Sequence, residues 1–187
     1  QYALPERFIL FVSTIEPRKN VATLLQAFRK LKDDYRMPHR LVLAGRKGWL
    51  FDDVFATVSA LRLEQECIFL GRVEVENLLY LYNCADLLVH PAFYEGFGLP
   101  PLEAMACGTP VVASNVSALP EIVGDAGLLV DPNDVAGLTV AIWRALTDEQ
   151  MRARMIARGL ARASQFSWQR AARETLRVYH QLGDQAG

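Results

Sequence analysis

The chain has 187 residues, 51% hydrophobic and 22% charged, a composition typical of one soluble globular domain with a substantial core. Its 20 basic and 21 acidic residues give a net charge of −1, so no global basic field points to nucleic acid and any phosphate ligand must be held by local groups. No apolar run approaches the roughly 20 residues of a membrane-spanning helix.

Six short apolar runs follow one another along the chain, and each predicts a strand, because continuous apolar stretches of this length are typical of buried parallel strands. They lie at residues 8–12, 41–45, 67–71, 87–90, 110–113 and 127–130. Helices are predicted between and after them: one that Asn20 caps and that buries Leu24, Leu25, Phe28 and Leu31, a short one after Gly98, and others at residues 50–61, 76–84, 133–145, 148–165 and 168–182.

This alternation predicts an α/β fold, a Rossmann-like doubly wound parallel sheet with helices on both faces. Residues 1–166 are assigned to that domain. The last helix, within residues 167–187, is expected to leave the core because its surface is more apolar than a free terminal helix needs, through Trp168, Leu176, Val178, Tyr179 and Leu182. Ligands of such sheets bind beyond the carboxyl ends of the strands, where polar turns follow the first four predicted strands.

The first of these turns carries Arg18 and Lys19 just before a helix N-terminus. Arginine offers a planar fork for phosphate and lysine a mobile point charge, so the pair suits a diphosphate. The other interpretation is a pair of solvated loop cations. The same two interpretations apply to Arg46 and Lys47 in the turn after the second strand, where solvation is favoured.

The stretch YEGFGLPPLE at residues 94–103 follows the fourth predicted strand. Gly96 and Gly98 allow a backbone to come close to a ligand and to adopt conformations that a side chain would forbid. The following Pro100-Pro101 pair suits the first turn of a helix. The amides near Gly98 and Leu99 are then free to face an anion at a helix N-terminus, which carries about half a positive charge. The stretch predicts a phosphate cradle with a carboxylate on each side, Glu95 and Glu103.

This string resembles the E-x7-E region of retaining glycosyltransferases of family 4, which have the GT-B fold. The resemblance covers nearly the whole chain and matches the C-terminal, donor-binding half of such enzymes. It implies transfer of a hexose from an NDP-sugar, with retention of configuration, to a glycan or lipid-linked acceptor. The acceptor would be bound by an N-terminal domain that is absent here, toward which the last helix would cross. A chain that begins with Gln1 is interpreted accordingly as a fragment or a processed form.

The resemblance also implies roles for single residues. Glu95 would contact the donor sugar and act in catalysis, with Gly96 and Phe97 in the donor-sugar loop. Arg18, Lys19, Gly98 and Leu99 would bind the donor diphosphate, and Glu103 the ribose hydroxyls, since a carboxylate has two acceptor oxygens. The nucleotide base would meet Val73, largely through backbone atoms, and Arg72.

The family usually has an arginine five residues before the lysine of this turn, where this chain has Thr14. The turn instead resembles a subgroup with the pattern G-T-[IL]-E-P-R-K-N, in which Arg18 would replace the missing cation. That subgroup often contains mannosyltransferases of surface polysaccharides, which favours GDP-mannose as the donor. Because the basic residues and helix amides would neutralise the diphosphate, no metal or other cofactor is expected.

Simpler interpretations of several residues stay open. Glu103 would fall in the first turn of its helix, where the helix dipole alone favours a carboxylate. Glu95 could hydrogen-bond local amides. His90 is interpreted as a structural residue rather than a base, and residues 117–121 as mainly structural. No His/Cys cluster has metal-binding spacing, so no bound metal is expected.

Two other functions are compatible with the pattern: an NDP-sugar 2-epimerase, which shares the architecture, and a non-catalytic nucleotide-sugar binding module. The three scattered cysteines, Cys67, Cys84 and Cys107, lie in apolar surroundings and favour buried thiols in a reducing compartment. We therefore expect a cytoplasmic protein, with the full-length enzyme at the inner face of the membrane.

Overall fold

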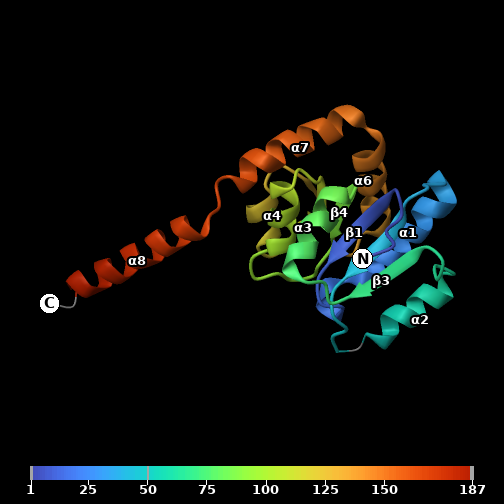
Figure 1. Ribbon diagram of the computed structural model, residues 1–187, viewed down its shortest axis with the longest axis horizontal. Helices are drawn as coiled ribbons and strands as arrows, with labels where there is room; N and C mark the ends of the chain where they lie inside the picture. The colour runs from blue at the N-terminus through green and yellow to red at the C-terminus, as the bar shows by residue number, and fades with distance from the viewer. Residues whose placement is uncertain (1, 50, 186–187) are drawn as a thin grey trace.

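The computed structural model describes residues 2–49 and 51–185, with side chains through Gln181, and contains a six-stranded parallel sheet of order β3-β2-β1-β4-β5-β6 (Figure 1). This order is that of a doubly wound Rossmann-like sheet, which confirms the predicted α/β class. The strands are β1 (Phe8–Val12), β2 (Arg40–Ala44), β3 (Cys67–Gly71), β4 (Leu87–His90), β5 (Val111–Ser114) and β6 (Leu128–Val130).

The predicted helices are present with small shifts at their ends, and a short helix, α5, and a 3-10 turn are additional to them. The helices are α1 (Val21–Tyr35), α2 (Asp52–Ala60), α3 (Val75–Cys84), α4 (Leu99–Ala106), α5 (Leu119–Val123), α6 (Val135–Thr147), α7 (Glu149–Ala163) and α8 (Trp168–Gln185), with the 3-10 turn, η1, at Pro17–Lys19. The predicted start of α2 at Leu50 lies outside the described residues. Asn133 does not begin α6, because Asp134 caps it by accepting the N–H of Gly137 at 2.8 Å.

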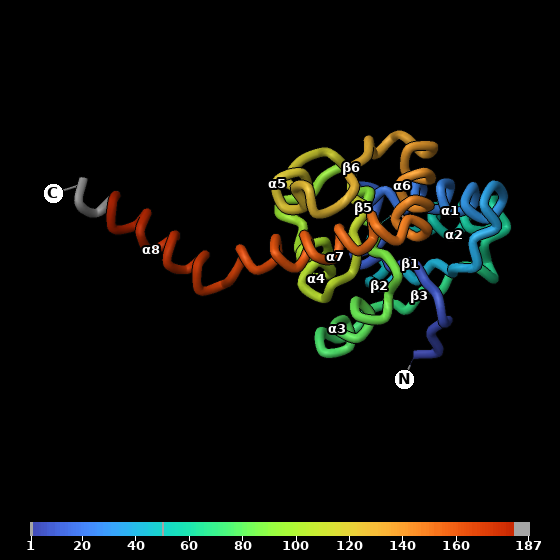
Figure 2. Tube along the Cα trace, turned by 90° about the horizontal axis from the view of Figure 1, so that it is seen from above, coloured from blue at the N-terminus to red at the C-terminus, as the bar shows by residue number. Residues whose placement is uncertain are grey.

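Helices cover both faces of the sheet (Figure 2). Alternate residues of β1 enter opposite cores, as the two-residue period of a strand requires. Ile9 and Phe11 pack with residues of α1, α2 and α6, whereas Phe8, Leu10 and Val12 pack with residues of α3, α4 and α5. The predicted apolar face of α1 is fully buried, with Leu24, Leu25, Phe28 and Leu31 all at 0% exposure.

The turns after the first three strands are tied together at the carboxyl edge of the sheet. The N–H of Ser13 donates to Ala44 O at 3.1 Å, and the N–H of Gly45 donates to Gly71 O at 2.8 Å. A Cβ atom at Gly45 would lie 1.7 Å from Ser13 O, so only glycine permits this approach. The order also makes β1 and β4 neighbours, and the turns that follow them meet at the point where the strand order reverses.

The two last helices differ in their relation to the body of the molecule. Figure 1 shows α7 running along the body and α8 projecting away from it. Helix α7 comes so close to α4 that a Cβ at Gly159 would lie 3.3 Å from Met105 Cγ. In α8, Trp168 is 80% exposed and Val178 51%, as expected for an apolar surface without a partner in this domain. The Leu182 side chain, part of the same prediction, lies outside the described residues.

The prediction of three buried thiols is only partly correct. Cys67 is buried, and burial raises the pKa of its thiol to about 12. Cys107 is half-buried, and Cys84 is exposed at the C-terminal end of α3.

Candidate functional site

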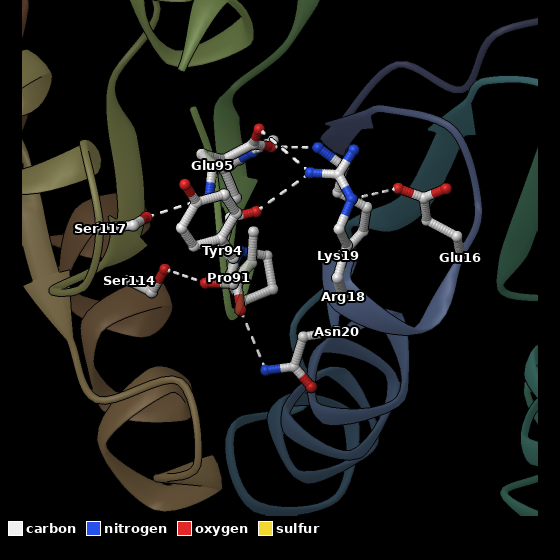
Figure 3. Close-up of polar contacts among 11 residues, drawn as sticks. Glu16, Arg18, Lys19, Asn20, Pro91, Tyr94, Glu95, Ser114 and Ser117 are labelled. Carbon is white, nitrogen blue, oxygen red and sulfur yellow. Dashed lines mark hydrogen bonds and ion pairs between the residues drawn. The ribbon is translucent and has the colours of Figure 1, made fainter. Parts of the chain in front are cut away.

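The turn between β1 and α1 is fixed by Asn20. This residue adopts a left-handed conformation (φ 57°, ψ 40°), and its side chain is buried. Its amide nitrogen donates to Pro91 O at 2.9 Å, drawn in Figure 3, and to Pro132 O at 2.7 Å. Asn20 does occupy the N-cap position of α1, but the prediction that its side chain caps the helix is wrong, because no N–H of the described helix donates to its amide oxygen and the residue is left-handed rather than extended. The amide instead joins the turn to the neighbouring loops.

Lys19 is buried beneath this turn and pairs with Glu95. Its Nζ atom is hydrogen-bonded to Glu95 Oε1 (Figure 3), and the residue is only 6% exposed. The alternative in which Lys19 is a solvated loop cation is therefore wrong. Its charge is already balanced by a carboxylate.

His90 is the second buried partner of Glu95. Its Nε2 atom lies 2.6 Å from Glu95 Oε1, and the residue is 0% exposed. Burial favours a higher pKa for Glu95, but the hydrogen bonds and charges of His90 and Lys19 outweigh it and lower that pKa to about 2. An ionised carboxylate only accepts, so we place a proton on His90 Nε2. The histidine thus orients Glu95, in agreement with its predicted structural role.

Arg18 lies at the surface on the same side. Its Nε atom is 2.6 Å from a carboxylate oxygen of Glu16, and its Nη1 atom donates to Tyr94 O at 3.3 Å. The distance from Nη1 to Glu95 Oε2 is 3.8 Å. Half of the Arg18 side chain is exposed, so its guanidinium is available to an incoming anion, unlike the Lys19 ammonium.

The glycine loop leads into α4, whose N-cap is Gly98 with φ 106°. This conformation favours glycine, as predicted. Gly96 is different, because its φ is not positive and a Cβ there would meet open space. The prediction that Gly96 adopts a conformation forbidden to other residues is therefore wrong. The open space around it leaves room for a ligand. Because the first N–H groups of a helix have no intrahelical acceptor, those of Gly98 and Leu99 are the donors that this N-terminus offers, before Pro100.

The position of Glu103 corrects a second prediction. Helix α4 begins at Leu99, so Glu103 is its fifth residue and not a member of its first turn. A dipole effect at the helix N-terminus therefore does not explain this carboxylate, since that effect fades within the first turn. Glu103 is exposed and accepts a hydrogen bond from the buried Tyr82 hydroxyl at 2.7 Å.

A cavity of about 310 Å³ opens at the carboxyl edge of β1, β2 and β3. Val73, itself buried, and the exposed Arg72 line it, so two residues predicted to meet the base share one hollow. Its other walls come from Val12, Ser13, Thr14, Ala44, Gly45, Arg46 and Leu78. The two basic residues of the turn after β2 were predicted either to extend the phosphate site or to be solvated, and they differ in position. Arg46 lines the cavity, whereas Lys47 Nζ lies 4.7 Å from the ring centroid of Phe51.

Two contacts of the site, made by Ser117 and by Phe166, were not predicted from the sequence. Ser117 Oγ accepts the N–H of Glu95 at 3.0 Å (Figure 3), which ties the segment before α5 to the glycine loop. Phe97 is half-exposed and packs edge-on against Phe166, with ring centroids 6.1 Å apart. Only the strand order brings such residues together, so no local motif in the sequence marks them.

The described residues contain no group of three or more His, Cys, Asp and Glu side chains placed to hold a metal ion. Among the described helices, none combines the length and apolarity that a membrane crossing requires.

The sequence matches the glycosyl transferases group 1 family over residues 2–162. The chain belongs to this family. It is 48% identical over 175 residues to the O-antigen chain mannosyltransferase B of Escherichia coli, covering 94% of this chain and 46% of that protein. The chain thus spans less than half of this relative's length.

Solved structures of the same fold agree with the family assignment. The sucrose-phosphate synthase of Thermosynechococcus elongatus superposes with a TM-score of 0.85 at 33% identity, over 97% of this chain and 47% of that one. The Anabaena HepE protein in complex with UDP-glucose gives a TM-score of 0.76 at 27% identity, over 85% of this chain and 44% of that one. These neighbours are glycosyltransferases of the GT-B type. Their similarity confirms that this chain has the predicted Rossmann-like fold of one half of a GT-B enzyme.

Proposed function

We propose that this chain is the donor-binding half of a retaining family 4 glycosyltransferase, which moves a hexose from an NDP-sugar to a glycan or lipid-linked acceptor. The observation that carries the proposal is the convergence of Arg18, the Lys19–Glu95–His90 cluster and the N-terminus of α4 where β1 and β4 meet. Ligands of doubly wound sheets bind at such a reversal of strand order. Family membership makes a nucleotide-sugar the fitting ligand.

The donor diphosphate is placed between Arg18 and the N-terminus of α4. Negative charge grows on this leaving group as the glycosidic bond breaks, and preset donors that face it stabilise the transition state. Arg18 and the N–H groups of Gly98 and Leu99 supply such donors. Lys19 is buried, so its charge acts on the diphosphate from farther away. We expect this charge to be balanced without a metal ion or another cofactor.

Glu95 is assigned to the donor sugar, beside Gly96 and Phe97. With a pKa of about 2 its carboxylate is ionised at neutral pH, so it accepts hydrogen bonds from sugar hydroxyls and faces developing positive charge. It does not donate a proton at that pH. The nucleoside extends in two directions, with the ribose toward Glu103 and the base into the cavity beside Val73 and Arg72.

GDP-mannose is the proposed donor. The E-P-R-K-N turn at residues 16–20 and the likeness to a mannosyltransferase support mannose, and a neighbour solved with UDP-glucose supports nucleotide-sugar binding in general. We further propose that the acceptor is bound by an N-terminal domain, against which the apolar face of α8 packs. The full-length enzyme would then act in the cytoplasm, at the inner face of the membrane, on acceptors carried there.

A transfer assay tests this function. Radiolabelled GDP-mannose and UDP-glucose, each with EDTA, are offered to residues 1–187 and to a longer protein that carries the acceptor domain. We expect glycoside only from the longer protein, and NMR should find the donor's anomeric configuration in the product. Free epimerised sugar would favour a 2-epimerase instead, and donor binding without any product would favour a binding module. Turnover by residues 1–187 alone would contradict the division into two halves.

A further inference from the structure

Tyr82 lies outside the residues assigned above, yet it contacts one of them directly. Its hydroxyl donates to Glu103 Oε2 at 2.7 Å, which joins α3 to α4. Tyr82 is 2% exposed, whereas Glu103 is exposed to solvent. A buried, immobile donor is thus paired with the carboxylate assigned to the ribose.

Several contacts fix the Tyr82 ring. It belongs to the apolar core that also contains Leu81, Ala104 and Met105. The main chain of Tyr82 is held as well, because its carbonyl accepts a hydrogen bond from the buried Thr109 Oγ1 at 2.6 Å. Because the ring is close-packed, its hydroxyl has only one position. The core therefore sets the direction from which Glu103 accepts this hydrogen bond.

The hydroxyl is also fixed in its protonation state. Burial raises the pKa of Tyr82 well above its usual range, and the charge and hydrogen bond of the Glu103 carboxylate raise it further. Tyr82 is therefore a donor at every working pH. It occupies Oε2 of Glu103, and the hydrogen bonds described for this part of the chain leave Oε1 to an outside donor.

We propose that Tyr82 is a positioning residue that fixes the plane of the Glu103 carboxylate, so that its free oxygen meets the ribose hydroxyls. An unsupported glutamate on an exposed helix face samples several rotamers, and ordering it on binding has an entropic cost. A carboxylate that is already fixed in the free protein avoids that cost. The gain applies only to a ligand whose hydroxyls bind the carboxylate. Tyr82 thereby selects ribonucleotides over their deoxy analogues, an inference that rests on the proposed donor site.

The test compares nucleotides with and without the ribose diol. Calorimetry measures the affinities of GDP and UDP and of their 2′,3′-dideoxy analogues for residues 1–187. For wild type we expect the better of the two nucleotides to exceed its dideoxy analogue by about tenfold or more, the range for hydrogen bonds to a charged group. Tyr82→Phe should reduce this ratio by roughly threefold to tenfold, by weakening only the ribonucleotide.

Two further variants separate a positioning role from a structural one. Tyr35→Phe removes the matching hydroxyl from a tyrosine of α1 that stacks on Trp143 with centroids 5.0 Å apart, so the ratio should not change. Glu103→Asp withdraws the carboxylate from Tyr82 without touching the buried ring. Because the shorter side chain also draws the carboxylate back from the ribose, the ratio should fall at least as far as in Tyr82→Phe, whose folding is checked by a thermal melt.

Each outcome points to one conclusion. A ratio that falls in Glu103→Ala but keeps its wild-type value in a folded Tyr82→Phe protein would overturn the role of Tyr82 and leave the ribose assignment in place. A ratio unchanged in Glu103→Ala would overturn the ribose assignment itself and the role of Tyr82 with it. Wild type that binds neither nucleotide would overturn the proposed function. In the Glu103→Ala background, adding Tyr82→Phe should have no further effect.

Discussion

The Glu95 carboxylate already forms hydrogen bonds within the protein in the absence of a ligand. Lys19 and His90 both reach the same oxygen, and both are buried. The charge of Lys19 is therefore largely balanced in the free protein. An incoming diphosphate meets the half-exposed Arg18 first, so we expect Arg18 to carry the larger share of its charge recognition.

Arg18→Ala should weaken GDP binding by about 1.5–3 kcal/mol, the range for hydrogen bonds to charged groups. Because the contact is solvent-exposed, this loss should shrink as salt is raised. Guanosine, which has no phosphate, should bind both proteins equally. Calorimetry at low and high salt measures these affinities, with Arg154→Ala, an exposed arginine of α7, as control. Equal losses for GDP and guanosine would remove Arg18 from the phosphate site.

Lys19→Met should destabilise the fold by about 3 kcal/mol at pH 7, since it leaves the Glu95 carboxylate without its buried cation. The pKa of Glu95 is lowered from 4.5 to about 2, so its paired form stabilises the fold above pH 4.5 and this contribution is lost as pH falls toward 2. The difference between variant and wild type should shrink over that range.

Urea denaturation at pH 7 and pH 3 measures this difference. Lys30→Met is the matched control, because Lys30 forms an exposed pair with Asp34 at 3.3 Å. Exposed pairs contribute about 0–1 kcal/mol. A Lys19→Met protein as stable as the control variant would contradict the buried cluster.

At the scale of elements, the N-terminus of α4 depends on one backbone conformation. Gly98 has φ 106°, and a Cβ there would lie 3.0 Å from Leu119 Cδ2. Gly98→Ala should therefore cost about 1–3 kcal/mol of stability and also weaken GDP binding, because the first amides of the helix would turn. Gly96→Ala, in open space, should change stability by less than about 0.5 kcal/mol. Thermal melts and calorimetry of both variants compare them, and equal effects would count against this account of the loop.

The elements themselves were largely predictable from the sequence, because each apolar run is buried by the sheet that it joins. Contacts between elements were not. The motif at Asn20 favoured a local side-chain cap, but the residue adopts a left-handed conformation and its amide nitrogen donates to two carbonyls distant in sequence. The burial of Lys19 likewise depends on His90 and Glu95, which only the adjacency of β1 and β4 brings near. Glu103 was assigned to the first turn of its helix, but α4 begins at Leu99, before the two prolines, so Glu103 falls just beyond that turn.

At the scale of the whole molecule, a buried histidine at the amino edge of the sheet links stability to pH. His39 is 5% exposed, and its Nε2 lies 3.5 Å from Asp86 Oδ2. Burial lowers its pKa from 6.5, Asp86 opposes this shift, and Arg7, Lys32 and Arg152 add to it. The unfolded chain thus binds a proton near pH 6.5 that the folded chain does not.

His39→Gln should therefore flatten the stability profile below pH 6.5. In wild type, the contribution of His39 is present above that pH and is lost as pH falls toward the lower pKa of the folded state. Urea midpoints at pH 7.5, 6.5 and 5.5 measure the slope, and His180→Gln, on the projecting helix α8, is the control. Parallel profiles for wild type and His39→Gln would show that this histidine is not the linked group.

We expect this domain to hold a nucleoside diphosphate at its carboxyl edge without metal. Calorimetric titration of residues 1–187 with GDP, UDP and ADP in the presence of EDTA tests it most directly. We predict weak but saturable binding at one site, tightest for GDP, that is lost in a protein carrying both Arg18→Ala and Glu103→Ala. Binding that appears only after a divalent metal is added, or that survives both substitutions undiminished, would contradict the account.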